Sequence, residues 1–148
     1  LCMGCKSMVI AASGDGILVS DKEQSAQIKP YVDKLAGQAM YAEKSWGSFT
    51  VLDVQDDSMT IKVELLPGHS LHYHSHEHRD EVWTVMSGMG SVIIDGMQRM
   101  VRPGDVVTMP AGCKHTLIAE TKVSVIEVQL GKDINVDDKK KFDLDIKE

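Results

Sequence analysis

Five of the six histidines in this chain lie within one stretch, residues 68–88. That stretch constrains the fold more than any other, because residues two apart on an extended strand point to the same face. His74 and His76 can therefore direct two imidazoles to one point, and Glu81 can add a carboxylate from the apolar run that follows it. Two or three imidazoles with one carboxylate suit a divalent transition metal.

A framework of glycines and prolines surrounds these residues. The spacing of Gly68, His74, His76, Glu81 and Gly88 resembles the first cupin motif without a mismatch. The second cupin motif is matched downstream by Gly104, Pro110, Gly112 and the sixth histidine, His115. The alternative, a histidine-rich exposed strand that chelates metal by chance, gives no role to His115 or to the glycines.

The cupin resemblance implies an all-β fold. This fold is the double-stranded β-helix, a jelly-roll-like barrel that holds a metal ion in its mouth. The two motifs imply that one divalent metal ion is bound by His74, His76, Glu81 and His115.

Composition and charge narrow the classes of partner. The chain has 148 residues, of which 43% are hydrophobic, and this suits one folded domain with an appendage. The formal net charge of -6 disfavours nucleic acid and anionic membranes as partners. We find no apolar run long enough to span a bilayer and no signal peptide. Three cysteines without a disulfide framework fit a reducing compartment, so we expect a cytoplasmic protein.

The pattern along the chain predicts two parts. Residues 1–45 predict an extension with a hairpin over 7–20, a helix over 22–36 that Pro30 breaks near Lys29, and a linker over 40–44. Residues 46–148 predict the metal-binding domain, with a polar tail over 131–148 that wraps the surface or frays. Its strands are expected over 48–55, 59–66, 70–76, 81–87, 91–95, 98–102, 105–109, 114–119 and 123–130. Short strands at this spacing indicate an antiparallel sandwich or barrel, with Asp95-Gly96 as its clearest two-residue turn.

A narrower resemblance covers most of the chain. Several segments resemble the isomerase domain at the C-terminus of bifunctional mannose-1-phosphate guanylyltransferase/mannose-6-phosphate isomerase proteins. They are WGSF at 46–49, HRDEVW at 78–83, PAGCKH at 110–115, IEVQLG at 126–131 and the acidic pair at 137–138. Residues 9–22 look like the end of the guanylyltransferase part, but the Gly-rich catalytic loop ending in GTR is absent from this sequence. His74 stands where that family usually has Gln, and Lys141 where it has Arg.

This second resemblance implies a metal-dependent isomerase that converts mannose 6-phosphate to fructose 6-phosphate. It favours zinc as the metal, with manganese, iron and nickel as alternatives, and a homodimer follows by analogy with other cupins. The reaction needs a base that carries a proton between C1 and C2 of the sugar. The candidates for that base are Lys62, Glu64, His72 and Glu127.

Phosphate recognition needs a cation, and Arg79 and Lys114 are the candidates for substrate binding. Several of these residues have ordinary structural alternatives. Lys62 and Glu64 can form an ion pair on a solvent-facing strand, and Arg79 can orient Glu81.

Two other functions remain open at this point. The first is a non-catalytic cupin module that binds a sugar or sugar nucleotide. The second is another cupin enzyme, such as an iron-dependent dioxygenase. Turnover of the sugar phosphate separates the isomerase from the module, and the identity of the metal separates it from the dioxygenase.

Overall fold

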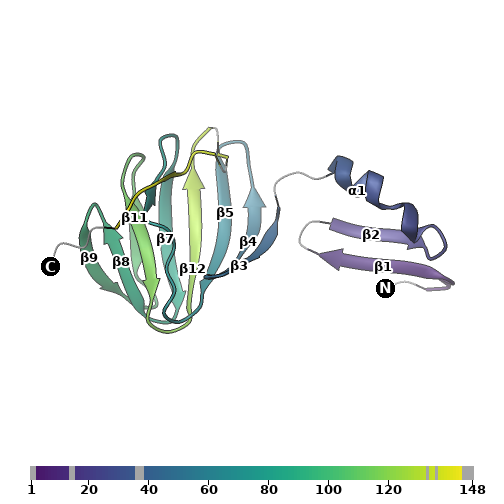
Figure 1. Ribbon diagram of the computed structural model, residues 1–148, viewed down its shortest axis with the longest axis horizontal. Coiled ribbons are helices and arrows are strands. Elements are labelled where there is room, and N and C mark those ends of the chain that lie inside the picture. Colours follow the sequence, from purple (N-terminus) through teal and green to yellow (C-terminus); the bar gives the residue numbers. More distant parts are fainter. Residues whose placement is uncertain (1–2, 14–15, 36–38, 133, 136, 145–148) are drawn as a thin grey trace. The chain divides into compact units, whose positions relative to one another are not determined.

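The computed structural model describes residues 3–13, 16–35, 39–132, 134–135 and 137–144 (Figure 1). The chain divides into two compact units, Leu1–Tyr41 and Ala42–Glu148. No helix among the described residues is long and apolar enough to cross a membrane.

The first unit is a β-hairpin followed by a short helix. Strands β1 (Met8–Ser13) and β2 (Gly16–Asp21) pair antiparallel, as the sequence predicts. The predicted helix is broken into a 3-10 turn, η1 (Ser25–Gln27), and a helix, α1 (Lys29–Leu35). The break falls next to Lys29 because Pro30 has no amide hydrogen to donate and is tolerated only in the first turn of a helix. None of the described side chains in residues 3–33 is buried.

The second unit is built from two antiparallel sheets. One sheet has the strand order β10-β7-β12-β5-β4-β3 and the other has the order β13-β6-β11-β8-β9. The strands of the first are β3 (Tyr41–Lys44), β4 (Gly47–Val54), β5 (Ser58–Leu65), β7 (Asp80–Ser87), β10 (Val106–Met109) and β12 (Val123–Leu130). Those of the second are β6 (His74–Ser75), β8 (Gly90–Ile94), β9 (Met97–Val101), β11 (His115–Ala119) and β13 (Lys140–Lys141).

Alternation along the strands places the core between the sheets. On β5, Met59, Ile61, Val63 and Leu65 are buried, whereas the residues between them are partly exposed. Residues two apart on a strand share a face, so one face of the sheet packs inside the barrel. The turn between β8 and β9 is the predicted Asp95-Gly96, and both residues have positive φ, 46° and 84°, as a type I′ turn requires.

Two predicted boundaries are wrong. Residues 41–44, predicted as a linker, form β3 at the edge of the larger sheet. The strand predicted over 70–76 is regular only at His74–Ser75, although Ser70 makes an isolated bridge to Ile118. In the tail, residues 140–141 pair with β6 as β13, so this part of the tail wraps the barrel.

Candidate metal centre

The four predicted ligands converge in the interior, at the point where the two sheets face each other. His74 on β6 lies directly opposite His115, the first residue of β11, while Glu81 comes from β7 of the other sheet. The ligand atoms of His74, His76, Glu81 and His115 all lie within 4.8 Å of one another, and all four residues are buried.

Backbone carbonyls fix how the three imidazoles point. In each ring, Nδ1 lies at hydrogen-bonding distance from a carbonyl oxygen, which can only accept. Each Nδ1 must therefore donate a proton, and Nε2 is left for the interior. The accepting carbonyls are those of His72 for His74 (2.6 Å), Cys113 for His115 (3.0 Å) and Asp138 for His76.

The carboxylate of Glu81 contacts two of the three histidines and Trp83. Its Oε1 lies 3.0 Å from Nε2 of His76, and its Oε2 lies 3.2 Å from Nε2 of His115. Trp83 Nε1 donates to Oε2 over 3.2 Å. Burial acts to raise the pKa of Glu81, but the hydrogen bonds from His115 and His76 outweigh it and hold that pKa well below its ordinary value. Glu81 is therefore a carboxylate, the form that binds a cation.

The donor set fits a divalent metal ion. Burial is the main reason that the pKa of His74 falls to about 2, so this imidazole is neutral and can act as a ligand. With each Nδ1 already donating, the contacts from His76 and His115 to Glu81 need either a proton on each Nε2 or a cation among the ligand atoms. Three imidazole nitrogens and one carboxylate suit zinc, iron, nickel or manganese.

A second buried carboxyl group faces the same interior. Glu127 on β12 lies opposite Trp83, and Gln129 on the same strand lies opposite Glu81. Gln129 Nε2 donates to Glu127 Oε1 over 2.5 Å. Burial, and after it the charge of Glu81, raises the pKa of Glu127 to about 8.

Arg79 is buried and its guanidinium contacts the cluster directly. Nε donates to Oε1 of Glu81 over 3.1 Å, and Nη2 lies 3.1 Å from Nε2 of His76. Nη1 donates to the carbonyl of Asn135 over 3.0 Å. The structural alternative in which Arg79 orients Glu81 is thus observed.

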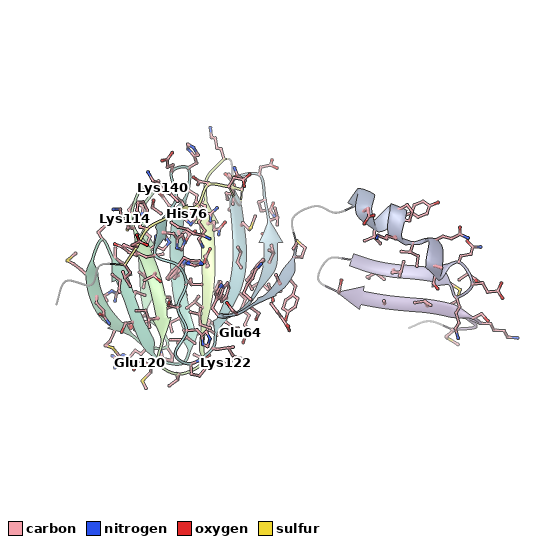
Figure 2. All side chains as sticks on the ribbon, in the orientation of Figure 1. Glu64, His76, Lys114, Glu120, Lys122 and Lys140 are labelled. Atoms are coloured by element: carbon pink, nitrogen blue, oxygen red, sulfur yellow. The ribbon has the colours of Figure 1, made fainter. Side chains whose placement is uncertain are left out.

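Lys62 and His72 are not brought to the cluster. Lys62 lies opposite Ile126, whose side chain points away from the face that carries Glu127, and it pairs with Glu64 at 3.4 Å. Glu64 lies toward the end of the barrel opposite His76 (Figure 2). His72 is exposed because the strand begins only at His74, and only its carbonyl contacts the site.

Lys114 lies at the rim on the same side as His76. It is exposed, and its Nζ sits 4.3 Å from the centre of the Phe142 ring. Lys140 lies over the same ring at 5.7 Å, and Figure 2 shows Lys114, Lys140 and His76 toward one end of the barrel. Two cationic side chains therefore lie at the end of the barrel that holds His76.

Residues of the C-terminal tail belong to the site but were not assigned to it from the sequence. They are Asn135 and Asp138, which contact Arg79 and His76 through their carbonyls. The only signal for them is the acidic pair at 137–138.

Comparison with known proteins identifies the family. A family model described as mannose-6-phosphate isomerase C-terminal matches residues 33–144. The chain belongs to this family. Since the match ends at residue 144, the family region includes the tail that contacts His76 and Arg79.

Among characterised proteins, the chain is similar to the mannose-1-phosphate guanylyltransferase of Escherichia coli (strain K12). It is 26% identical over 149 residues, which cover 95% of this chain and 31% of the relative. The chain thus spans about a third of the length of that relative.

Solved structures agree on the fold. An RmlC-like cupin from Shewanella frigidimarina has a TM-score of 0.59 and 20% identity, covering 68% of this chain and 88% of its own. A cupin-superfamily sugar phosphate isomerase from Silicibacter pomeroyi has a TM-score of 0.52 and 23% identity, covering 56% of this chain and 58% of its own. The predicted double-stranded β-helix of the cupins is confirmed.

Proposed function

We propose that the cupin domain is a metal-dependent isomerase that converts mannose 6-phosphate to fructose 6-phosphate and uses zinc. The observation that carries the proposal is the pairing of a buried three-histidine, one-carboxylate cluster with a second buried carboxyl group, Glu127. The family description, mannose-6-phosphate isomerase C-terminal, supports the choice of substrate.

The residues divide the work of an aldose–ketose isomerisation. His74, His76, Glu81 and His115 would hold a divalent ion, which would supply Lewis acidity to the reaction. Glu127 takes the proton from one sugar carbon and returns it to the neighbouring carbon. Before an ion is bound, the pKa of Glu127 is about 8, so this carboxyl group takes up a proton more readily than an ordinary one.

Lys114, at the His76 end of the barrel, binds the phosphate group of the substrate. Lys114 is exposed on the His76 side of the barrel and presents a cation to solvent. We assign the phosphate to Lys114 rather than to Arg79, because the guanidinium of Arg79 is buried and three of its nitrogens already have partners. Arg79 instead holds the carboxylate of Glu81.

An isomerase assay tests the proposal. The metal-free protein is loaded in turn with zinc, manganese, iron and nickel, and fructose 6-phosphate is measured with mannose 6-phosphate as substrate. We expect turnover with zinc, abolition by His76→Ala, and a loss of about 10²-fold or more with Glu127→Gln, the range of general acid–base catalysis.

Glu120→Gln is the matched control, since Glu120 is exposed and lies toward the opposite end of the barrel. Full activity in Glu127→Gln would remove Glu127 from the mechanism. A protein that binds metal and the sugar phosphate without turning it over would be a binding module instead.

We also propose that the protein forms a homodimer through its first unit. This unit exposes large apolar side chains, including Ile17, Val19 and Tyr31, at 76%, 59% and 68% of their full exposure. Exposed apolar groups of this size favour burial against a partner. Sedimentation of a chain that lacks residues 1–41 should then give a monomer, and an unchanged dimer would contradict the proposal.

A further inference from the structure

The segment that follows β12 crosses one end of the barrel, and Figure 1 shows it in yellow. It adds β13 to the edge of β6, pairing Lys140 with Ser75 and Lys141 with His74. The next residue continues the contact, since Phe142 N donates to Tyr73 O over 2.9 Å. β6 has only two residues, and without β13 its remaining ladder is the pairing of His74 with His115. The tail therefore supports the strand that carries the first metal ligand.

Asp138 in this tail holds the loop that carries the second ligand. Its Oδ1 accepts from Glu77 N over 2.9 Å, and its Oδ2 accepts from His78 N over 3.1 Å. Its carbonyl oxygen accepts from Nδ1 of His76. A single residue thus fixes three consecutive positions, 76–78, from 60 to 62 positions away along the chain.

The same turn of the tail reaches the third ligand through Arg79. Asn135 O accepts from Nη1 of Arg79, and Nε of Arg79 donates to Glu81. The turn has its own local support, because Oδ1 of Asn135 accepts from the amides of Asp137 (2.9 Å) and Asp138 (3.0 Å). Two ligands, His76 and Glu81, are therefore oriented by two residues of the tail, Asp138 and Asn135.

We propose that Asp138 is a positioning residue that sets the affinity of the site for its metal. Its carboxylate anchors the turn on the amides of Glu77 and His78, and this anchoring keeps its carbonyl on Nδ1 of His76. The proton then stays on Nδ1, and Nε2 points into the cluster, where its lone pair can bind a metal ion. The inference rests on the proposed metal function but not on the isomerase reaction.

The test compares Asp138→Ala with Asp137→Ala in the full chain. Asp137 is the adjacent acid and is exposed, so it controls for the loss of one negative charge. Zinc affinity is measured by competition with a chromogenic chelator. We expect the Kd for zinc to rise by about 10–100-fold in Asp138→Ala, the range found for groups that orient a metal-binding histidine, and to stay unchanged in Asp137→Ala.

Asp138→Asn tests the anchoring itself. Its side chain keeps one acceptor oxygen for the two amides, so we expect a Kd between those of the wild type and Asp138→Ala. Long-range ¹H–¹⁵N spectra of the metal-free protein give a readout that does not depend on metal. These spectra should show the His76 proton moving from Nδ1 toward Nε2 in Asp138→Ala.

Several results would overturn the inference. One is an equal zinc affinity in Asp138→Ala and the wild type. Another is an equal loss in both alanine variants, which would mean that charge alone matters. A wild-type protein that binds no zinc would overturn it together with the metal centre. Zinc binding without isomerase activity would count against the proposed reaction only.

Discussion

At the scale of single residues, Glu127 shows how a barrel interior changes acid–base behaviour. It is a buried carboxyl group on the same inward face as Glu81, and one amide, Gln129, donates to it. A charge without a full set of partners is costly in such a place, so the neutral form is favoured up to about pH 8.

This raised pKa predicts a dependence of stability on pH. The unfolded chain ionises Glu127 near its ordinary value of 4.5, whereas the folded chain keeps the proton up to about pH 8. Stability contributed by the neutral group is therefore present at low pH and lost as pH rises through this window, at up to about 1.4 kcal/mol per pH unit.

The substitution Glu127→Gln should remove this loss of stability at rising pH, because glutamine does not ionise. The variant's free energy of unfolding, relative to the wild type, should rise between about pH 5 and about pH 8, measured by urea unfolding of the metal-free proteins. Glu120→Gln should show no such rise. A flat difference for Glu127→Gln would mean that Glu127 is ionised in the folded protein.

At the scale of elements, turns with positive φ fix where strands end. Gly88 follows β7 with φ of 81°, and a Cβ there would lie 2.1 Å from the carbonyl oxygen of Lys122. Gly96 has a similar φ of 84°, but a Cβ there would meet no atom within 4 Å. A side chain at Gly96 would meet backbone strain alone, whereas one at Gly88 would meet both backbone strain and a steric clash.

Alanine at these positions should have unequal effects. We expect Gly96→Ala to cost about 1–2 kcal/mol of unfolding free energy, which is the cost of the left-handed conformation. Gly88→Ala should cost about 3 kcal/mol or more, since the chain must also move away from Lys122. Urea unfolding measures both, and equal costs would show that the turn after β7 relaxes freely.

Local patterns predicted the ligands because the information for them is local. His74, His76, Glu81 and His115 sit in two short motifs with fixed glycine spacing, and the structure brings all four together. Lys62 was predicted as a candidate base, but it lies on the outward face of β5, opposite the face that the apolar alternation of this strand marks as inward. His72 was predicted from parity in a strand that does not extend to it.

Local sequence patterns could not predict contacts between segments that are far apart in the chain. Asp138 and His76 are 62 residues apart, and no periodicity relates the tail to β6. Residues 41–44 likewise become a strand only because β4 lies beside them. Pairings of this kind depend on the closed barrel rather than on the segment.

At the scale of the whole molecule, the second unit carries the buried core. Every buried residue among those described lies at position 51 or later, and the first unit contributes none. Burial of apolar surface is the main favourable term in folding, so the second unit should be stable by itself.

A chain of residues 42–148 should therefore unfold cooperatively and bind zinc as the full chain does. Circular dichroism against temperature and the chelator competition measure these two properties. A non-cooperative melt would show that the first unit contributes to the stability of the barrel.

The ligands of the metal site come from both sheets, with His74 and His115 on one and Glu81 on the other. A bound ion would thus fasten the two layers together at the His76 end of the barrel only. The end that holds Glu64, Glu120 and Lys122 is joined by the chain itself, because residues 88–89 and 120–122 connect strands of one sheet to strands of the other there (Figure 2). The loaded barrel would then be held together at both ends, by the ion at one end and by these short connections at the other.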